Sequence, residues 1–477
     1  MLISDIFKSN KNRVFIIDSV EEKSYSYFDF YNLIMNLSKS ISDRVEINKS
    51  EKIALYLDNS IYLAALYFWA FFNGIKIFPI SKKTPIGQVY NILIEYKIST
   101  IISDVDLHNL DVSSLNIKDL SLSGRKYRLD SMPSIDYDTP ILFLLTSGST
   151  GVPKCVAHNL SNFINNGTSF INMHNIGRND RFVTLLEMSY MAGFYNMFFL
   201  SFIAQSSVVI KPPFHAGNIF SFWSELKKVE VNILWIVPSI IKLLNQLDRD
   251  KEGAKYCQLI KYIFSCTANL SLQDKVDFSE KYTKNVYNTY GLSETLFVSS
   301  EKSDSHYNVD NYVGQPFPGV YIDNKKIYIK SNKVFEGYYD PDSETLFKES
   351  SFNTGDTGFI NNKGLFVTGR DKDIIIKGGI NINPRALESK FRTLDFIKDI
   401  CIVGMKDDIF GEKPVCALTI NSNIRVDYIK EMKEFSSQNI PSDSAINDFV
   451  ILDSLPLNNN NKVDKFKVVE ILLQRLE

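Results

Sequence analysis

Short apolar runs alternate with longer amphipathic stretches between residues 52 and 287 of this chain. The apolar runs have the length of buried strands, and the stretches between them, such as 239–247 and 271–282, have helical periodicity. Alternation of this kind predicts an α/β fold, in which parallel sheets are covered by helices. The strands that we expect on this basis are 52–57, 75–80, 100–102, 141–145, 182–186, 207–210, 233–237, 262–264 and 285–287.

The pattern changes near Val313, where short strands and turn signals replace the alternation, as in KKIYIKSNKVFEGYY. A compact α/β segment follows TGRDKD, and a chain of 477 residues is too long for one core. We therefore expect a large N-terminal domain over residues 1–371, built from helix-flanked, mainly parallel sheets and a small β-barrel-like part. A small α/β domain is expected over 372–477, with strands at 399–404, 415–420 and 449–452 and helices at 427–435 and 465–473.

Charge and cysteine content argue against several classes of function. The formal net charge of -2 provides no basic field for nucleic acid, so no nucleic-acid partner is expected. The five cysteines are scattered without metal-ligand spacing, which is typical of reduced, buried thiols in a cytoplasmic protein. The most apolar segment, 61–72, is too short to span a bilayer. We expect it to be a buried helix, and we expect no integral membrane contact.

The segment LLTSGSTGVPK places small residues directly after a buried strand. Such a run lets the backbone approach a ligand closely, and hydroxyl groups with a nearby lysine favour an anion such as a polyphosphate. The spacing of the common mononucleotide P-loop is absent, because Gly148 and Gly151 are only three residues apart and Lys154 is followed by Cys155. Taken alone, the segment is also compatible with a flexible polar turn.

Three further segments carry side chains that suit a nucleotide. In YGLSET, Tyr290 offers a flat face to a base, and Glu294 offers oxygen ligands to Mg²⁺. Asp356 in a tight turn could accept the hydroxyl groups of a ribose, and Arg370 could reach ribose or phosphate. Near the end of the chain, PLNNNNKVDK places Lys462 in a polar loop before a helix. Taken alone, YGLSET is also compatible with a surface turn, the Asp356 and Arg370 pairings are more often surface salt bridges, and a lysine such as Lys462 is most often solvated.

Together and in this order, the segments resemble the adenylate-forming enzymes. That family includes acyl-CoA and aryl-CoA synthetases, adenylation domains of peptide synthetases, and beetle luciferases. The resemblance covers nearly the whole chain, and the ordered set is far more specific than any one motif. The matching segments are TSGSTGVPK, YGLSET, TGD, GRDKDIIIKGGINI and PLNNNNKVDK, with VPS, VGQPFPGV and GYY as further matches.

The resemblance implies a ligase that uses ATP and Mg²⁺ to form an acyl-AMP and then an acyl thioester. Lys462 would bridge the substrate carboxylate and the α-phosphate, Ser293 would contact the α-phosphate region, and Glu294 would hold Mg²⁺. Lys372 would be the hinge about which a mobile C-terminal domain rotates between the two half-reactions. The other residues implied to bind the nucleotide are Thr146, Ser147, Gly148, Ser149, Thr150, Gly151, Lys154, Thr267, Ala268, Asn288, Tyr290, Gly291, Asp356 and Arg370.

The chain departs from the family pattern at two places. Asn461 stands where the family usually has the glycine before the catalytic lysine, and asparagine tolerates left-handed backbone angles. CTAN, at 266–269, replaces a GGAP-like stretch at the rim of the acid pocket.

The acid pocket itself is expected at Tyr190, Met191 and Gly193. Met191 aligns with the aspartate of relatives that activate α-amino acids, so a small-molecule acid with a neutral acyl or aryl group is expected. Ordinary core packing is the alternative interpretation of this segment.

The acceptor thiol is left open by the residues. IIIKGGINI resembles the CoA-ligase version of the hinge region, which makes CoA the first expectation. Loading of the phosphopantetheine arm of a separate carrier protein is the alternative, since the chain holds no carrier domain. A nucleotide-binding homologue that has lost catalysis is a third hypothesis, and the presence of Lys462, Glu294 and Asp356 argues against it.

Overall fold

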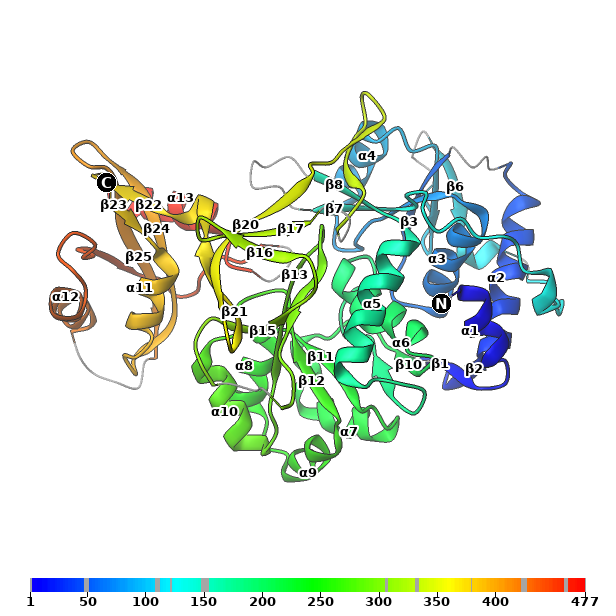
Figure 1. The fold of residues 1–477 in the computed structure, drawn as a ribbon, viewed down its shortest axis with the longest axis horizontal. Coiled ribbons are helices and arrows are strands. Elements are labelled where there is room, and N and C mark those ends of the chain that lie inside the picture. The colour runs from blue at the N-terminus through cyan, green and yellow to red at the C-terminus, as the bar shows by residue number, and fades with distance from the viewer. Residues whose placement is uncertain are drawn as a thin grey trace. The chain divides into compact units, whose positions relative to one another are not determined.

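The computed structural model describes residues 2–46, 51–107, 112–120, 122–146, 154–304, 308–330, 334–378, 380–421, 427–458 and 462–476. The chain divides into two compact units (Figure 1). The first unit consists of Met1–Val320 with Ile329–Phe352, and the second of Tyr321–Tyr328 with Asn353–Glu477. The second unit thus begins before Lys372, and the expected boundary at that residue stays a prediction about where the chain pivots.

The largest sheet of the first unit has eight strands in the order β19-β18-β8-β7-β4-β3-β5-β6. The strands β7, β4, β3, β5 and β6 are parallel, and β8 and β18 are antiparallel to their neighbours. Helices α3 (Ile61–Asn73) and α4 (Ile86–Glu95) supply two of the crossovers between parallel strands. The strands are β3 (Lys52–Tyr56), β4 (Lys76–Pro79), β5 (Thr100–Ser103), β6 (Ser113–Asn116), β7 (Leu142–Thr146), β8 (Lys154–His158), β18 (Gly337–Asp340) and β19 (Thr345–Phe347).

Two further sets of strands complete the first unit. A four-stranded sheet has the order β2-β1-β10-β9, and another run has the order β11-β12-β13-β14-β15, in which β11, β12 and β13 are parallel. The helices α5 (Leu160–His174), α7 (Phe222–Lys228), α8 (Pro238–Leu247), α9 (Lys251–Leu259) and α10 (Leu272–Tyr282) belong to this unit. The strands are β1 (Val14–Asp18), β2 (Lys23–Ser26), β9 (Arg181–Val183), β10 (Ser207–Ile210), β11 (Ile233–Ile236), β12 (Tyr262–Ser265), β13 (Tyr287–Leu292), β14 (Leu296–Ser300) and β15 (Tyr312–Pro316).

Helix α3 lies in the core of the first unit, as its continuous apolar sequence predicts. The side chain of Ser60 caps its first turn by accepting a hydrogen bond from the backbone of Leu63, and Gly74 ends it in the left-handed conformation. Its aromatic side chains pack against distant rings, and the centroids of Phe68 and Phe202 are 4.7 Å apart. No helix within the described residues is both long enough and apolar enough to cross a membrane.

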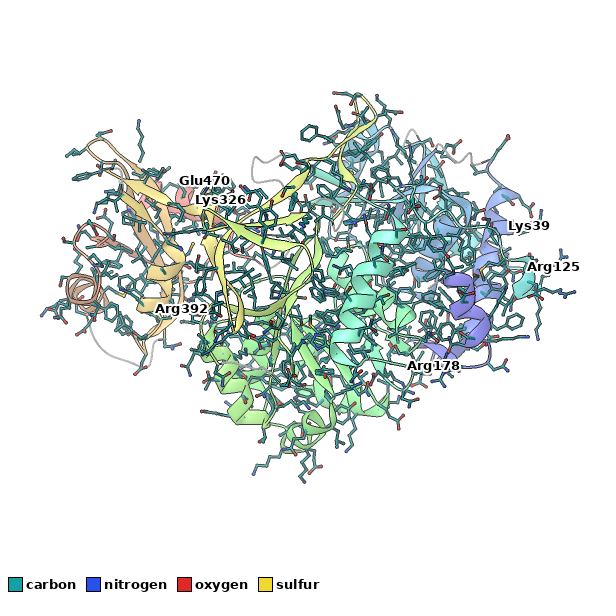
Figure 2. The ribbon with its side chains drawn as sticks, viewed as in Figure 1. Lys39, Arg125, Arg178, Lys326, Arg392 and Glu470 are labelled. Carbon is teal, nitrogen blue, oxygen red and sulfur yellow. The ribbon has the colours of Figure 1, made fainter. Side chains whose placement is uncertain are left out.

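Charged side chains of the first unit, such as Lys39, Arg125 and Arg178, lie at its surface (Figure 2). The five cysteines are all buried and form no disulfide, in agreement with the expectation of reduced thiols. Burial raises the pKa of the Cys257 and Cys401 thiols to about 12, so these groups stay protonated at neutral pH.

The second unit contains strands in the order β21-β20-β17-β16 and a sheet formed by β22 to β26. Residues of β24 (Ile397–Asp407) alternate between two apolar clusters. Ile400 and Ile402 belong to the cluster that includes α11 and α12 residues, whereas Cys401 and Val403 belong to the cluster that includes α13 residues. The other elements are β16 (Val320–Asp323), β17 (Lys326–Lys330), β20 (Ser351–Asn361), β21 (Gly364–Arg370), β22 (Ile375–Lys377), β23 (Ile380–Ile382), β25 (Gly411–Ile420), β26 (Asp448–Ile451), α11 (Pro384–Phe391), α12 (Tyr428–Asn439) and α13 (Lys465–Leu476).

The predicted α/β fold, with a large unit of helix-flanked sheets and a smaller α/β unit, is confirmed. One expected strand is displaced: the strand placed at 285–287 begins at Tyr287 and runs to Leu292. The YGL residues form the end of this strand, because they pair with β14 in a hairpin.

Candidate active site

The two ends of the glycine-rich segment lie side by side. Thr146 ends β7 and Lys154 begins the antiparallel strand β8, and the two residues are register partners. The hydroxyl of Thr146 donates to the Lys154 carbonyl over 3.1 Å. The Lys154 side chain is exposed at the start of β8, where it could meet an anion. Five predicted phosphate-binding residues lie outside the described part of the chain: Ser147, Gly148, Ser149, Thr150 and Gly151.

The YGLSET segment forms the hairpin that joins β13 to β14. Gly291 has no room for a side chain, because a Cβ atom there would lie 2.0 Å from the carbonyl oxygen of Leu296. The hydroxyl of Thr295 accepts a hydrogen bond of 3.0 Å from the backbone of Leu292 and closes the turn. Ser293 and Glu294 therefore lie at the tip of a tight hairpin, and both residues are half-buried.

The predicted base-binding residues follow β12 and lie on β13. The hydroxyl of Thr289 donates to the Ser265 carbonyl over 3.0 Å and ties the two strands together. Asn288 has a structural contact of its own, since its side-chain amide donates to the Tyr312 carbonyl over 3.1 Å. Thr267 has a φ of 73°, which is strained for a β-branched residue. Thr267 and Ala268 are both exposed, whereas Tyr290 is half-buried.

Tyr338 contacts both of the charged residues that the motifs predict in this unit. Its hydroxyl donates to Oε1 of Glu294 over 2.8 Å, and its ring centroid lies 4.7 Å from Nζ of Lys154. Burial, together with the Glu294 carboxylate, raises the pKa of Tyr338, so the phenol remains a hydrogen-bond donor. The GYY match implied no role for Tyr338, because no local pattern shows which strands meet.

The side chain of His158 contacts the backbone of the same hairpin. The side chain is fully buried at the end of β8, and Nε2 lies 2.6 Å from the Ser293 carbonyl oxygen. Burial lowers the pKa of His158 to about 4, so the ring is neutral at pH 7 and Nε2–H is the donor. This residue was missed from the sequence, since a lone histidine in an apolar strand carries no motif.

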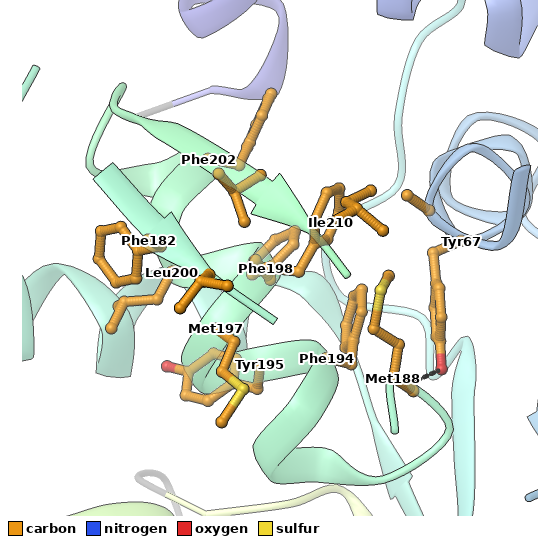
Figure 3. Packing of buried hydrophobic residues seen from close by; sticks show 14 of the residues in the cluster. Tyr67, Phe182, Met188, Phe194, Tyr195, Met197, Phe198, Leu200, Phe202 and Ile210 are labelled. Carbon is orange, nitrogen blue, oxygen red and sulfur yellow. Dashed lines mark hydrogen bonds between the residues drawn. The ribbon is translucent and has the colours of Figure 1, made fainter. Parts of the chain in front are cut away.

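The segment predicted to line the acid pocket is only partly available to a ligand. Tyr190 and Met191 are half-buried, whereas Phe194 and Tyr195 are fully buried in the core (Figure 3). Phe194 stacks on Tyr67 with centroids 3.9 Å apart, and the Tyr195 hydroxyl donates to the Phe163 carbonyl over 3.0 Å. Core packing thus accounts for Phe194 and Tyr195, and only the beginning of the segment remains for a pocket wall.

Gly193 lies in the π-helical turn Ala192–Phe199, a conformation that is often found at functional sites. A Cβ atom at this position would lie 2.0 Å from the Glu187 carbonyl oxygen. The Glu187 carboxylate accepts hydrogen bonds from Ser81 and forms an ion pair of 2.8 Å with Lys83. Since the two charges compensate each other, this pair adds no net charge beside Tyr190.

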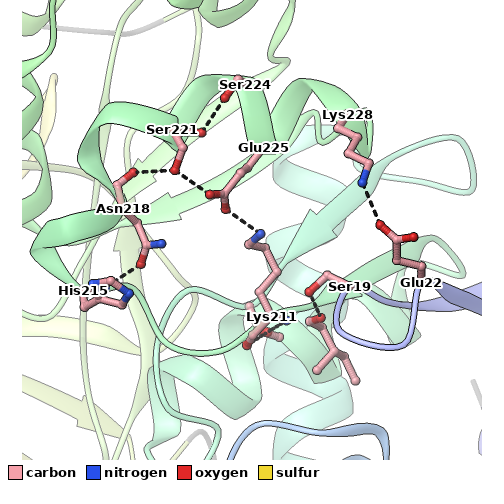
Figure 4. A network of polar contacts seen from close by, with 11 residues as sticks. Ser19, Glu22, Lys211, His215, Asn218, Ser221, Ser224, Glu225 and Lys228 are labelled. Atoms are coloured by element: carbon pink, nitrogen blue, oxygen red, sulfur yellow. Dashed lines mark hydrogen bonds and ion pairs between the residues drawn. The ribbon is translucent and has the colours of Figure 1, made fainter.

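A cavity of about 250 Å³ in the first unit involves other residues. Lys211 forms an ion pair of 2.7 Å with Glu225, and the Ser221 hydroxyl donates to the same carboxylate over 2.5 Å (Figure 4). These groups satisfy one another, and none of the side chains that line the cavity was predicted to bind nucleotide or acid. The cavity is therefore not part of the candidate site.

The second unit brings Asp356 and Arg370 together. They are register partners on β20 and β21, and Nε of Arg370 lies 3.0 Å from Oδ1 of Asp356. The Asp356 side chain is almost fully buried, while that of Arg370 is about 41% exposed. Because the Arg370 side chain is partly exposed while it pairs with Asp356, it could also contact a ligand.

Lys372 is the middle residue of the 3₁₀ turn Asp371–Asp373. The residues on either side of it form ion pairs with different elements of the unit. Asp371 pairs with Lys326 on β17 over 2.6 Å, and Asp373 pairs with Lys465 at the start of α13 over 2.7 Å. Partial burial, with smaller effects of the neighbouring cations, lowers the pKa of Lys372. The residues before and after Lys372 are thus anchored to separate elements.

Lys462 is exposed and is held by local backbone contacts. Its carbonyl accepts a hydrogen bond of 2.8 Å from the backbone of Asn458, and its N–H donates to the side-chain oxygen of Asn458 over 3.1 Å. A β-bridge between Leu457 and Val463 closes the turn. Asn461, the departure from the family pattern, lies outside the described residues.

The described side chains fit a magnesium ion that is shared with a triphosphate. They contain no group of three or more histidine, cysteine or acidic side chains that could hold a metal by themselves. Mg²⁺ bound by phosphate oxygens and water needs only one or two protein carboxylates. Glu294, half-buried at a hairpin tip and oriented by Tyr338, is suited to that part.

Comparison with known proteins identifies the family of the chain. Residues 5–339 match the AMP-binding enzyme family, and residues 386–462 match the AMP-binding enzyme C-terminal domain. A 2-succinylbenzoate–CoA ligase of Staphylococcus epidermidis is 24% identical over 482 residues, which cover 97% of this chain and 95% of that protein.

Two solved structures show the same fold. ATP-bound MatB from Rhodopseudomonas palustris superposes with a TM-score of 0.87 at 18% identity, covering 100% of this chain and 99% of that one. o-Succinylbenzoate CoA synthetase (MenE) from Bacillus subtilis, in complex with the acyl-adenylate OSB-AMP, has a TM-score of 0.82 at 19% identity and covers 98% and 97% of the two chains. The match over residues 5–339 spans more than half of the sequence, and the chain belongs to the AMP-binding, adenylate-forming family of acid–thiol ligases.

Proposed function

We propose that this protein joins a carboxylic acid to the thiol of CoA in two steps, through an acyl-adenylate. The observation that carries the proposal is the meeting of Lys154 and Glu294 on one side chain, Tyr338, although the three residues are far apart in sequence. A cation at the end of a glycine-rich segment and a carboxylate suited to Mg²⁺ are the two groups that an ATP triphosphate requires.

In the first step the substrate carboxylate attacks the α-phosphorus of ATP, and pyrophosphate leaves. Two anions must approach each other, so the ammonium of Lys462 would stabilise the developing charge between them. When bound, Mg²⁺ would neutralise phosphate charge. Asp356 would accept hydrogen bonds from the ribose, and Arg370 would orient it.

In the second step a thiol attacks the acyl carbon, and AMP leaves with the bridging oxygen. Lys462 is not needed there, because the acyl-adenylate carries its own leaving group. Rotation about Lys372 would move Lys462 away from the substrate between the two steps. The ion pairs that tie Asp371 and Asp373 to different elements support a pivot at Lys372.

An uncharged aliphatic or aromatic acid is the proposed substrate class. Tyr190 and Met191 are half-buried and apolar in character, and the nearby Glu187 is already paired with Lys83. A substrate ammonium placed against Met191 would lose its hydration, and the carboxylate of Glu187 is already engaged by Lys83.

ATP–pyrophosphate exchange with a panel of fatty, aryl, hydroxy and amino acids tests the proposal. We expect exchange with at least one neutral acid, followed by thioester formation when CoA is added. Exchange without a CoA thioester, but with transfer to a phosphopantetheine-loaded carrier protein, would favour the carrier alternative. Absence of exchange with every acid would favour a nucleotide-binding protein without catalysis.

A further inference from the structure

We propose that Tyr338 is a positioning residue that keeps Lys154 and Glu294 apart and oriented toward a magnesium-bound triphosphate. The inference rests on the proposed function and adds a residue to it. A single phenol makes both contacts: its hydroxyl donates to Glu294 over 2.8 Å, and its ring lies 4.7 Å from the Lys154 ammonium.

A spacer is needed because a lysine and a glutamate at one site attract each other. A direct ion pair would occupy the ammonium and the carboxylate, and both would be less available to phosphate and metal. Among the described residues Lys154 and Glu294 form no such pair, and each of them contacts Tyr338 instead. The phenol contacts both groups without neutralising either, since its hydroxyl donates to the anion while its face attracts the cation.

Rigid elements hold the phenol in place. Tyr338 lies on β18, paired with Val156 on β8, the strand that Lys154 begins. Its ring meets that of Phe335 edge to face, with centroids 4.9 Å apart. The backbone N–H of Phe335 donates to the Glu294 carbonyl over 2.8 Å, so the same short segment supports the tyrosine and the hairpin. Strand-borne support of this kind favours a precise arrangement.

Two variants of Tyr338 separate its two contacts, and a variant of another tyrosine serves as the control. Tyr338→Phe keeps the ring and removes the hydrogen bond, whereas Tyr338→Leu removes both contacts. Tyr25→Phe is the matched control, because the Tyr25 hydroxyl donates to the Glu21 carboxylate over 3.1 Å on β2. Equilibrium binding of ATP is measured by calorimetry with Mg²⁺ and with a chelator. The Mg²⁺ concentration for half-maximal pyrophosphate exchange is measured alongside.

For Tyr338→Phe we expect the Mg²⁺ requirement to rise about tenfold, the usual scale for a lost hydrogen bond to a charged group, with metal-free ATP binding nearly unchanged. Tyr338→Leu should weaken metal-free binding as well, because Lys154 can then pair with Glu294. In a Glu294→Gln background, Tyr338→Phe should have little further effect on the Mg²⁺ requirement, since its partner charge is gone. Tyr25→Phe should match the wild type in every measurement.

A Tyr338→Phe protein whose Mg²⁺ requirement equals that of Tyr25→Phe would overturn the inference and leave the proposed function intact. Equal, additive losses in the Glu294→Gln background would also overturn it, because they would show that the phenol acts elsewhere. A wild-type protein that does not bind ATP with Mg²⁺ would contradict the proposed function and this inference together. Melting temperatures of the variants distinguish loss of positioning from loss of fold.

Discussion

The Lys154–Glu294 region of the first unit and the Lys462 turn of the second unit hold their charged groups in different ways. In the first region, residues far apart in sequence meet across strands, and the buried His158 and the half-buried Tyr338 support them. In the second, an exposed lysine is held by backbone contacts with Asn458, four residues away. The groups proposed to bind phosphate are thus held by contacts between strands, whereas the lysine proposed to activate the acid lies on a short turn that is held by local contacts.

The Lys462→Ala substitution is expected to change activity the most. Adenylation should fall by about two orders of magnitude, since one preorganised charge contributes roughly 3 kcal/mol to such a barrier. Thioester formation from supplied acyl-AMP should remain near the wild-type rate. Both half-reactions are measured separately, with Lys467→Ala as the control for removal of an exposed lysine from the same segment. Pyrophosphate release close to the wild-type rate would exclude Lys462 and make Lys465 the next candidate.

Lys372→Pro should produce the opposite pattern, with thioester formation reduced roughly thirtyfold and adenylation retained. A 3₁₀ turn uses φ values close to that of proline, so the φ angle of residue 372 itself is compatible with the change. A pivot that must change its backbone angles would be blocked. Asn362→Pro, in the turn between β20 and β21, is the control. Equal losses in both half-reactions would indicate misfolding or a pivot at another residue.

Acid should weaken the first unit more than the second. Burial lowers the pKa of His158 to about 4 and that of His174 to about 3, below the usual value of 6.5. As the pH falls from 6.5 toward 4, the unfolded chain binds protons that the folded unit does not, so stability is lost. In the second unit, whose sequence has no histidine, burial instead raises the pKa of Glu388, which favours its folded state as the pH falls.

Tryptophan fluorescence measures this difference, because all three tryptophans, Trp69, Trp223 and Trp235, lie in the first unit. The free energy of unfolding reported by fluorescence should fall by up to about 1.4 kcal/mol per pH unit for each buried histidine. His158→Gln, which keeps a donor for the Ser293 carbonyl, should reduce that slope. A fluorescence-detected transition that does not change between pH 6.5 and 4.5 would contradict the assignment.

The smallest expected effect concerns the acid pocket. An α-amino acid should be at least about tenfold worse in pyrophosphate exchange than its neutral counterpart, equivalent to 1.4 kcal/mol, because its ammonium would lose hydration against Met191. Met191→Asp should weaken the preferred neutral acid. If an α-amino acid gives faster exchange than every neutral acid, Met191 does not line the pocket.

The sequence predicted the sheets and the motif-bearing loops because both have local patterns. Continuous apolar runs identify buried parallel strands such as β3 and β4. The glycine-rich segment after β7 lies outside the described residues, so its predicted loop stays a prediction. The extent of a strand was harder to predict: the expected strand ends at residue 287, whereas β13 continues through the YGL residues, since its pairing with β14 depends on a partner strand.

The supporting contacts could not be predicted from the sequence. The contacts of Tyr338 with Lys154 and of His158 with Ser293 join strands that are distant in sequence. The burial of Phe194 and Tyr195 likewise depends on partners such as Tyr67 and Phe163. A single sequence specifies such pairs only through the complete fold, so no local motif could have revealed them.

Transfer of labelled oxygen from the acid to AMP tests whether the reaction passes through an acyl-adenylate. The preferred acid is prepared with ¹⁸O in its carboxylate and incubated with the wild-type protein, ATP, Mg²⁺ and CoA, and the AMP is analysed by mass spectrometry. If the carboxylate attacks the α-phosphorus and the thiol then attacks the acyl carbon, each AMP carries one oxygen from the acid. Unlabelled AMP, or label found in inorganic phosphate or pyrophosphate, would contradict an acyl-adenylate and with it the roles proposed for Lys154, Glu294 and Lys462.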